Sequence, residues 1–333
     1  MMATEFDIAL REQVYFEALK EYEADQADTI TDEIIAALVA VLLKSGMTSF
    51  ADVTKKTFDA FMRKAREVLQ RKLGSFNTDF VKRMQEVVAV TLTSTKETLF
   101  AATGKRITEA AFNGTRGANK KLWKRITGDV VPGIGHTPSQ MVQDFTTSTY
   151  ALVTRTLRRA YADNWTMAQL IDELKGTADA DYRNGVLRKI TNQAKHVTRT
   201  LMQHAKAFLS YNLGRIVYDR YQWISTIDSA TTEICRHRHM KIFEYGKGPR
   251  PPAHINCRSV IVGILGNLAN QAPASFFDWI KAQPLAFLRD VLTPSEVEAI
   301  TSGTAQKADF NAYKNVRKLS PEQFGKRIAR MIE

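Results

Sequence analysis

The sequence predicts a mainly α-helical fold that carries one small α+β module, and three observations predict it. Apolar residues recur at helical spacing, with few interruptions, from about residue 5 to residue 220. Near residues 221–265 the spacing changes to the alternation typical of strands, which predicts a three-stranded sheet. Helical spacing then returns and predicts a helical C-terminal tail.

The first third of the chain predicts three helices. The first is expected to begin at Thr31, whose hydroxyl can cap the free amides of the next turn, and to end at Gly46. A second is expected over residues 49–74 and a third from Asn77 towards residue 104. We assign residues 1–112 to an N-terminal helical region.

Glycine and proline concentrate in residues 113–137, around a short basic segment. This composition favours turns, so the stretch is predicted to be a basic linker or a flexible surface arm. The basic segment can meet nucleic-acid phosphates and offers one ring for base stacking, although most such runs are solvated helix faces. Its candidate contacts are Lys120, Lys121, Trp123, Lys124 and Arg125.

Helices are predicted again from Pro138 onward. Proline suits the first turn of a helix because its missing N–H would be unpaired there. A short helix is expected over residues 166–175, closed by Gly176, and a long one from Val186 to about Tyr218. The expected strands are residues 222–227, 241–245 and 259–264, and the later helices are residues 275–292, 294–301 and 320–332.

Charge and cysteine usage restrict the classes of partner and compartment. The 333 residues carry a formal net charge of +12, which favours anionic partners such as nucleic acid. Two cysteines make no disulfide framework, so a reducing compartment is expected. The start does not read as a secretory signal, and the longest apolar run, residues 34–43, is about half of the roughly 20 residues that cross a bilayer, so no stable membrane insertion is expected.

Both cysteines and three of the six histidines lie between residues 235 and 257. Thiols and imidazoles are the usual ligands of tetrahedral zinc. His254 and Cys257 form a half-site on a turn stiffened by proline, and Cys235 can complete it with His239 or with His237. Three interpretations stay open at this point: a structural zinc site, buried cysteines without metal, and a Cys235–Cys257 disulfide.

Catalytic interpretations of these residues fit less well. The His-x-Glu and Pro-Cys-x-x-Cys segments of zinc deaminases are missing. A cysteine nucleophile would draw on His254 and Asn256, but residues two apart in a turn rarely point at one site.

The residues around the cluster resemble the signature of the Mu F-like minor head proteins, which are head morphogenesis proteins of tailed phages. In that family an Asp-x-x-Thr segment leads to a Cys or His, and Pro-Pro-x-His-x-x-Cys-Arg closes the motif. The matching residues here are Asp228, Thr231, Cys235, Pro251, Pro252, His254, Cys257 and Arg258. Many members have further cysteines where Thr232 and Ser259 stand, so a metal would need a histidine in their place.

This resemblance covers roughly residues 140–333 and implies a module over residues 138–265 followed by a helical tail over residues 266–333. It implies a non-enzymatic minor capsid protein, made in the host cytoplasm and carried in the virion. The implied partners are the portal protein, a capsid or scaffolding protein, and packaged double-stranded DNA bound without sequence preference, with no small-molecule substrate. From the residues alone, Asp228 and Thr231 are expected to cap the short helix that carries Cys235.

Two other functions remain open from the sequence. One is a zinc-dependent nucleic-acid-binding module. The other is a metallohydrolase, which would need an open coordination position and acid or base groups nearby. The sequence offers only Asp228, Glu233 and Glu244 for that second role.

Overall fold

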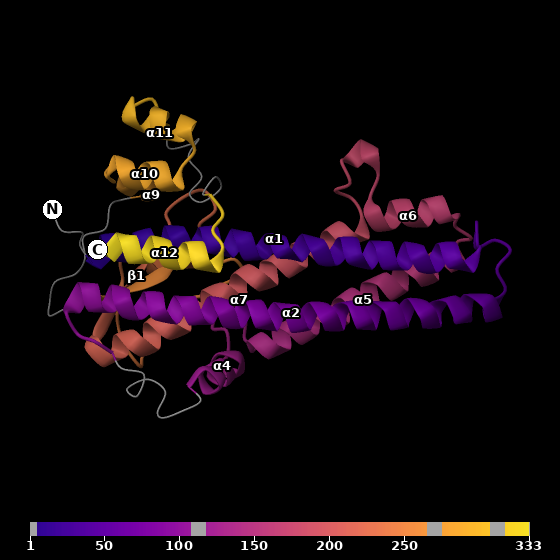
Figure 1. Cartoon of the computed structure of the whole chain (residues 1–333), viewed down its shortest axis with the longest axis horizontal. Helices are drawn as coiled ribbons and strands as arrows, with labels where there is room; N and C mark the ends of the chain where they lie inside the picture. The colour runs from indigo at the N-terminus through magenta and orange to yellow at the C-terminus, as the bar shows by residue number, and fades with distance from the viewer. Residues whose placement is uncertain (1–4, 108–117, 265–274, 307–316, 333) are drawn as a thin grey trace. The chain divides into compact units, whose positions relative to one another are not determined.

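The computed structural model describes residues 5–107, 118–264, 275–306 and 317–332 and confirms a mainly α-helical fold with a small three-stranded sheet (Figure 1). The chain divides into two compact units, each assembled from separate segments of the sequence. Unit 1 comprises Met1–Glu23, Met84–Pro138 and Arg199–Glu333, and unit 2 comprises Ala24–Arg83 and Ser139–Thr198. None of the described helices is long and apolar enough to cross a membrane.

Unit 2 is helical and has one apolar core. Its helices are parts of α1 (Glu5–Ser45), α2 (Lys55–Thr103) and α7 (Val186–Val217), nearly all of α5 (Pro138–Ala162), α6 (Met167–Lys175) and the 3-10 turn η1 (Ala178–Ala180). Three aromatic rings pack together in this core. The ring of Phe58 stacks on that of Tyr161 with their centroids 4.0 Å apart, and Phe50 packs edge-on against both. Such pairs stabilise a core beyond the area that they bury.

The predicted ends of α6 are confirmed. Thr166 is its N-cap and forms a capping box with Gln169, in which each side chain binds the other residue's backbone N–H. Gly176 closes the helix at a φ of 91°, a conformation that residues with a Cβ rarely adopt. Local sequence therefore determines this element.

The predicted breaks in the first third of the chain are wrong. Helix α1 runs through Thr31 without interruption, and α2 runs through both Gly74 and Asn77. A glycine inside a helix costs about 1 kcal/mol relative to alanine. The neighbouring turns of α2 bury Leu73 and Phe80, so packing on both sides of Gly74 offsets that cost.

Unit 1 holds the sheet and the C-terminal helices. Its remaining elements are α4 (Ala118–Gly128), β1 (Arg220–Ile224), α8 (Glu233–Arg238), β2 (Ile242–Glu244), β3 (Val260–Ile264), α9 (Phe276–Lys281), α10 (Leu285–Val291), α11 (Pro294–Thr301) and α12 (Pro321–Ile332). The single helix predicted over residues 275–292 is two helices, because residues 282–284 separate α9 from α10.

The stretch predicted to be a linker contains helix α4. Leu122 and Ile126 lie one turn apart and are buried in a core cluster with Phe208 and Leu209 of α7. Such packing fixes the helix in unit 1, so these residues do not form a flexible arm. The first part of the predicted linker, residues 113–117, lies outside the described residues.

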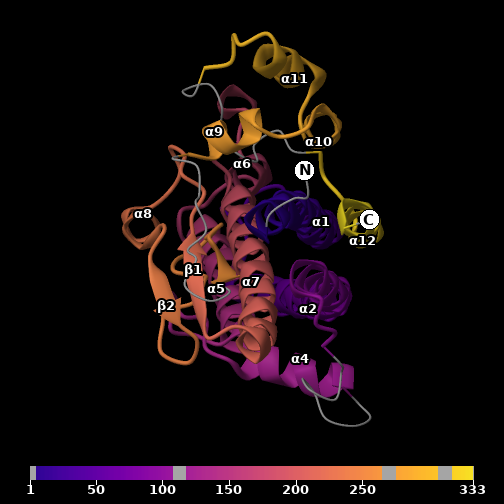
Figure 2. The same ribbon diagram turned by 90° about the vertical axis from the view of Figure 1, so that its left-hand side faces the viewer.

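The three strands form an antiparallel sheet in the order β2-β1-β3, which confirms the predicted module. Tyr221 of β1 pairs with Phe243 on one side and with Gly263 on the other. The sheet lies alongside α7 in unit 1 (Figure 2). A Cβ on Gly263 would lie 2.3 Å from the ring of Tyr218, so the sheet contacts this ring too closely for any other residue.

We expect Thr149→Val to stabilise unit 2. Thr149 of α5 is fully buried, and among the described residues its hydroxyl has no hydrogen-bond partner. An unpaired buried hydroxyl costs about 1–3 kcal/mol, and valine keeps the shape without that cost. Chemical denaturation should show a gain of about 1 kcal/mol.

The control for this prediction is Thr146→Val on the same helix. The hydroxyl of Thr146 accepts a hydrogen bond from Asn77 at 3.0 Å and donates to the carbonyl of Val142 at 2.9 Å. Its removal should destabilise the protein. Equal losses from the two substitutions would show that Thr149 has a partner after all.

Candidate metal centre

Three residues of the predicted cluster meet in unit 1. Cys235 is the third residue of α8, which follows β1, and His254 and Cys257 lie in the turn that leads to β3. The side-chain ligand atoms of these three residues all lie within 4.8 Å of one another, and the group can hold a metal ion. Both thiols are free and buried, and His254 is half-buried.

The spacing of the ligand atoms suits a tetrahedral ion. The two sulfur atoms are 3.8 Å apart, and Nε2 of His254 is 3.2 Å from the sulfur of Cys235. An ion with zinc–sulfur bonds of about 2.3 Å holds two sulfurs roughly 3.8 Å apart. Nδ1 of His254 lies 2.8 Å from the carbonyl oxygen of Ile255, and a donated hydrogen bond there leaves Nε2 unprotonated and facing the thiols.

The two thiols differ in acidity because they share a hydrogen bond. The bond from Cys235, helped by His254, lowers the pKa of Cys257 well below its ordinary value although burial opposes this. The same bond, followed by burial, raises the pKa of Cys235. The interaction with Cys257 also raises the pKa of His254. Cys257 is therefore the natural thiolate of the group, and thiolates are the form of cysteine that binds metal.

The other two histidines of the cluster, His237 and His239, do not join the group. His239 is the C-cap residue of α8, and its Nδ1 accepts a hydrogen bond from the backbone N–H of Ser225 at 3.1 Å. Burial lowers the pKa of His239, which keeps the ring neutral. Nε2 of the exposed His237 lies 2.7 Å from the amine of Lys241. The structure thus gathers three of the four predicted ligands and places His239 against β1.

The other signature residues form a second, interlocked group. Arg258 donates two hydrogen bonds of 2.7 Å to the carboxylate of Asp228, whose side chain is only 5 % exposed. The hydroxyl of Thr231 donates to the carbonyl of Thr226, and its oxygen lies 3.0 Å from the same carboxylate. Arg236 donates to the carbonyl of Asp228 at 2.5 Å. Two segments far apart in the sequence are therefore tied together around one buried carboxylate.

Asp228 and Thr231 were predicted to cap the helix that carries Cys235, and the structure gives them another role. The N-cap of α8 is Thr232, whereas Asp228 lies one turn earlier and accepts a hydrogen bond from the N–H of Ala230. The carboxylate is instead oriented by Arg258, a partner that lies 30 residues further along the chain. Pro251 and Pro252 of the signature are buried.

Buried polar groups of α1 and α7 support the turn that carries Cys257. Lys20 is 1 % exposed, pairs with Glu17 at 2.7 Å and donates to the carbonyl of Cys257 at 3.4 Å. Gln203 donates to the carbonyl of Ser259 at 2.8 Å. The sequence prediction missed both residues. The sequence signal that could have found them is that each is a polar residue on an apolar helix face. Such a residue is rarely buried unless it has a partner.

A glycine of the predicted linker also contacts the turn. The N–H of Gly133 donates to the carbonyl of Pro252 at 2.9 Å, and a Cβ at this position would lie 2.1 Å from the backbone of Ala253. Arg250 forms an ion pair with Asp129 of the same stretch. Residues 129–133 therefore contact the second half of the signature through one hydrogen bond and one ion pair.

The basic segment predicted to contact nucleic acid lies on α4. Lys120, Lys121, Lys124 and Arg125 are exposed. Trp123 is partly buried and packs against the core cluster that contains Leu122. The charges are thus accessible, but the ring belongs to the protein interior.

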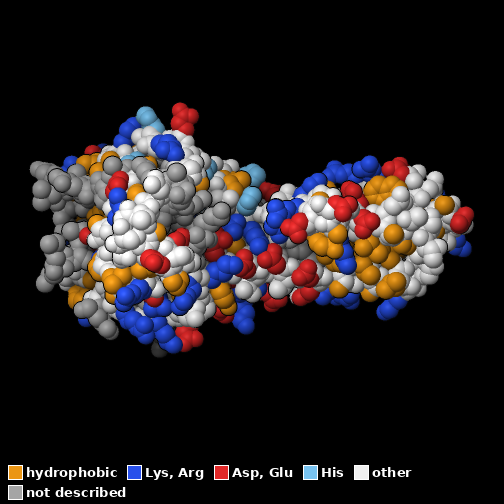
Figure 3. All heavy atoms as spheres, turned by 90° about the horizontal axis from the view of Figure 1, so that it is seen from above, with side chains coloured by type: hydrophobic (Ala, Val, Ile, Leu, Met, Phe, Trp, Pro, Cys, Tyr) orange, Lys and Arg blue, Asp and Glu red, His pale blue; other side chains and the backbone are white. Residues whose placement is uncertain are grey.

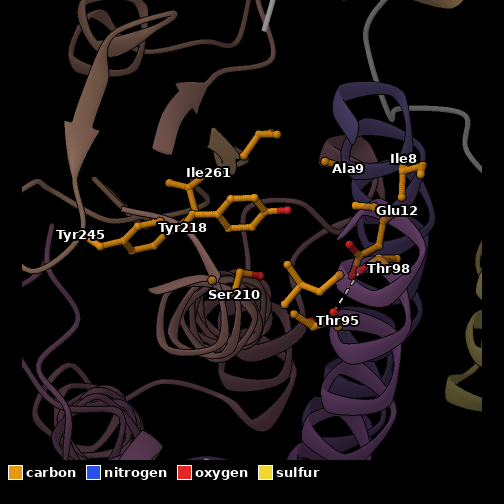
Figure 4. Close-up of a pocket in the computed structure, with 14 residues that line it drawn as sticks. Ile8, Ala9, Glu12, Thr95, Thr98, Ser210, Tyr218, Tyr245 and Ile261 are labelled. Carbon is orange, nitrogen blue, oxygen red and sulfur yellow. Dashed lines mark hydrogen bonds between the residues drawn. The ribbon is translucent and has the colours of Figure 1, made fainter. Parts of the chain in front are cut away.

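Unit 1 also has a small hollow, of about 70 Å³, between the sheet and the helices. Tyr218, Ser210, Glu12 and Thr95 line it (Figure 4). The carboxylate of Glu12 accepts a hydrogen bond from Ser94 at 3.0 Å and lies 3.7 Å from the amine of Lys206, which balances its charge. The hollow is too small for most organic substrates, since ligand pockets usually exceed about 300 Å³.

Comparisons of the chain with protein-family models, with curated proteins and with solved structures gave no match.

Proposed function

We propose that this chain is a non-enzymatic minor capsid protein of the Mu F-like type, which associates with the portal vertex and the head interior during phage assembly. The observation that supports it best is the interlocking of the signature. Asp228 and Thr231 from one segment and Arg258 from the other meet around one buried carboxylate. A motif whose members bind one another is suited to holding a small module rigid.

The proposal includes a structural metal, with zinc as its identity. Two sulfurs and an imidazole nitrogen are a ligand set that favours zinc among divalent ions. Cys235, His254 and Cys257 would hold the ion, which would cross-link α8 to the turn before β3. The fourth ligand would come from outside this group of three.

Catalytic zinc sites also have three protein ligands, so the number of ligands alone does not distinguish a metallohydrolase from a structural site. Two of its three acid and base candidates are engaged elsewhere, and the third, Glu233, is an exposed residue of α8 outside the group of three ligands. Asp228 is held by Arg258, and the exposed Glu244 pairs with Lys247 at 2.6 Å. A hydrolase would need one such group free beside the ion. This favours a structural role for the metal.

The partners that follow from the proposal are the portal protein, a capsid or scaffolding protein, and packaged double-stranded DNA. The net charge of +12 supports DNA contact without sequence preference. The rival, a zinc-dependent nucleic-acid-binding module, would retain a sequence preference at high salt, whereas a head protein would show only a steep loss of affinity with salt.

The test is the fate of the protein during phage assembly. We expect mass spectrometry of purified particles to detect the chain at a few copies beside the portal protein. We also expect deletion of its gene to yield heads that are defective, and the wild-type gene supplied in trans to restore them. A chain that stays in the cleared lysate, with normal particles formed in its absence, would refute the proposal.

A further inference from the structure

A hollow of about 390 Å³ in unit 1 is lined by four arginines from three helices. Arg11 comes from α1, Arg289 from α10, and Arg327 and Arg330 from α12. Among the described residues that line the hollow, Asp290 alone carries a carboxylate. The wall is therefore strongly positive, and the volume is in the range of ligand pockets.

The single carboxylate is fully engaged by the protein. One oxygen of Asp290 accepts a hydrogen bond from the hydroxyl of Tyr15 at 2.9 Å, and the other pairs with Arg327 at 2.5 Å. Burial raises the pKa of Tyr15, and the charge of Asp290 raises it further, so the phenol stays a donor. Asp290 therefore fixes Arg327 and Tyr15 in place and balances only one of the four positive charges.

The remaining arginines keep donors for a ligand. Arg11 donates its Nε–H to Gln283 at 2.8 Å and lies over the ring of Phe287 at 5.4 Å, which fixes the plane of its guanidinium. Arg289 and Arg330 are exposed, and neither has an acidic partner among the described residues. A planar guanidinium binds phosphate through two parallel N–H bonds, which lysine cannot do.

We propose that this hollow binds a phosphoryl group, with Arg289 and Arg330 as its main donors and Arg11 and Arg327 as positioned support. Lys and Arg side chains also gather at the lower left of Figure 3, on unit 1. The four arginines that line the hollow would draw a polyanion to it. This phosphoryl site is inferred from the residues of the hollow alone, so it stands whether or not the chain is a capsid protein.

The experiment compares two doubly substituted full-length proteins that carry the same net charge. Arg289→Gln/Arg330→Gln removes two guanidinium groups from the hollow. Lys281→Gln/Lys326→Gln removes two exposed amines of unit 1, which pair with Asp278 and Glu322 and do not line the hollow. Binding of a labelled DNA duplex is measured by fluorescence anisotropy at several salt concentrations, and binding of inorganic phosphate by calorimetry.

The arginine variant should bind its ligand at least about 10-fold more weakly at moderate salt, and the lysine variant about 2-fold more weakly or less. Nucleic acid would be the source of the phosphate if the arginine variant loses affinity for DNA. In that case the slope of log affinity against log salt concentration should also be smaller by about 2 in this variant. Loss of phosphate binding alone would identify a small phosphate ester. Equal affinity of the two variants for both ligands would overturn the proposal.

A third protein separates geometry from charge and guards against misfolding. Arg289→Lys/Arg330→Lys keeps both charges but loses the planar fork. We expect it to melt with the wild type and to bind at an affinity between those of the wild type and the glutamine variant. Wild-type affinity in this protein would show that charge alone attracts the ligand and that the hollow is not a built site.

Discussion

We expect Cys257→Ser to lose its bound zinc and to unfold well below the melting temperature of the wild-type protein. Serine is a poor zinc ligand, and the substitution also removes the fully buried thiol that Cys235 bonds. Zinc contributes on the order of 10 kcal/mol to the folding of small zinc-finger peptides. Here the module also has a buried apolar cluster around Trp223, which zinc-finger peptides lack, so a smaller loss, of about 3 kcal/mol or more, is expected.

Elemental analysis of the purified proteins, followed by thermal melting, checks this expectation. The wild-type chain should carry about one zinc ion, and the variant none. His237→Gln is the matched control, because this histidine lies on the same helix but outside the group of three. A wild-type protein without zinc, whose melting is insensitive to a chelator, would end the metal proposal.

A further variant addresses the fourth ligand. His239→Gln should keep its zinc, because the Nδ1 of His239 is bonded to the backbone of Ser225 and the ring is not part of the group. Loss of zinc in this variant would return His239 to the ligand set that the sequence predicted. Of the two histidine variants, only His239→Gln therefore distinguishes the group of three from the ligand set that contains His239.

Arg258→Met should be among the most destabilising single substitutions in unit 1. It leaves the carboxylate of Asp228, which is 5 % exposed, without the two hydrogen bonds that balance its charge. Breaking a buried ion pair from one side costs about 3–5 kcal/mol. Chemical denaturation of the full-length protein measures the loss.

The double variant Asp228→Asn/Arg258→Met tests the cause of that loss. Because the amide carries no charge, the double variant should recover part of the stability that Arg258→Met loses. Lys247→Met is the control within the same module, since Lys247 and Glu244 form an exposed pair. Exposed pairs contribute little, so no measurable loss is expected there. Equal losses at Lys247 and Arg258 would show that burial of Asp228 is not what matters.

Local signals predicted much of the fold. These signals act within a few residues, so they are visible in the sequence. They include the cap at Thr166, the proline at the start of α5 and the alternation of the strands. The breaks at Thr31 and Gly74 failed for the opposite reason. Whether a helix continues through a weak residue depends on the side chains that pack against the turns on either side.

The candidate site divides in the same way. Three of its ligands were predictable, because Cys235, His254 and Cys257 are chemically rare and close in the sequence. Lys20 and Gly133 were not, because they meet the turn only after distant segments have packed. His239 was predicted as a ligand, but α8 ends at Arg238, and the ring of His239 instead accepts a hydrogen bond from the backbone of Ser225 at the end of β1.

The division of the chain into units has a consequence for its synthesis. Both segments of unit 2 lie between the first and last segments of unit 1, so unit 2 is complete once residue 198 has been translated. Unit 1 must wait for α12, whose Phe324 packs edge-on against Phe16 near the start of the chain. Domains fold as units when their chain is available. Unit 2 can therefore fold on the ribosome, whereas unit 1 keeps apolar faces uncovered until α12 has been translated.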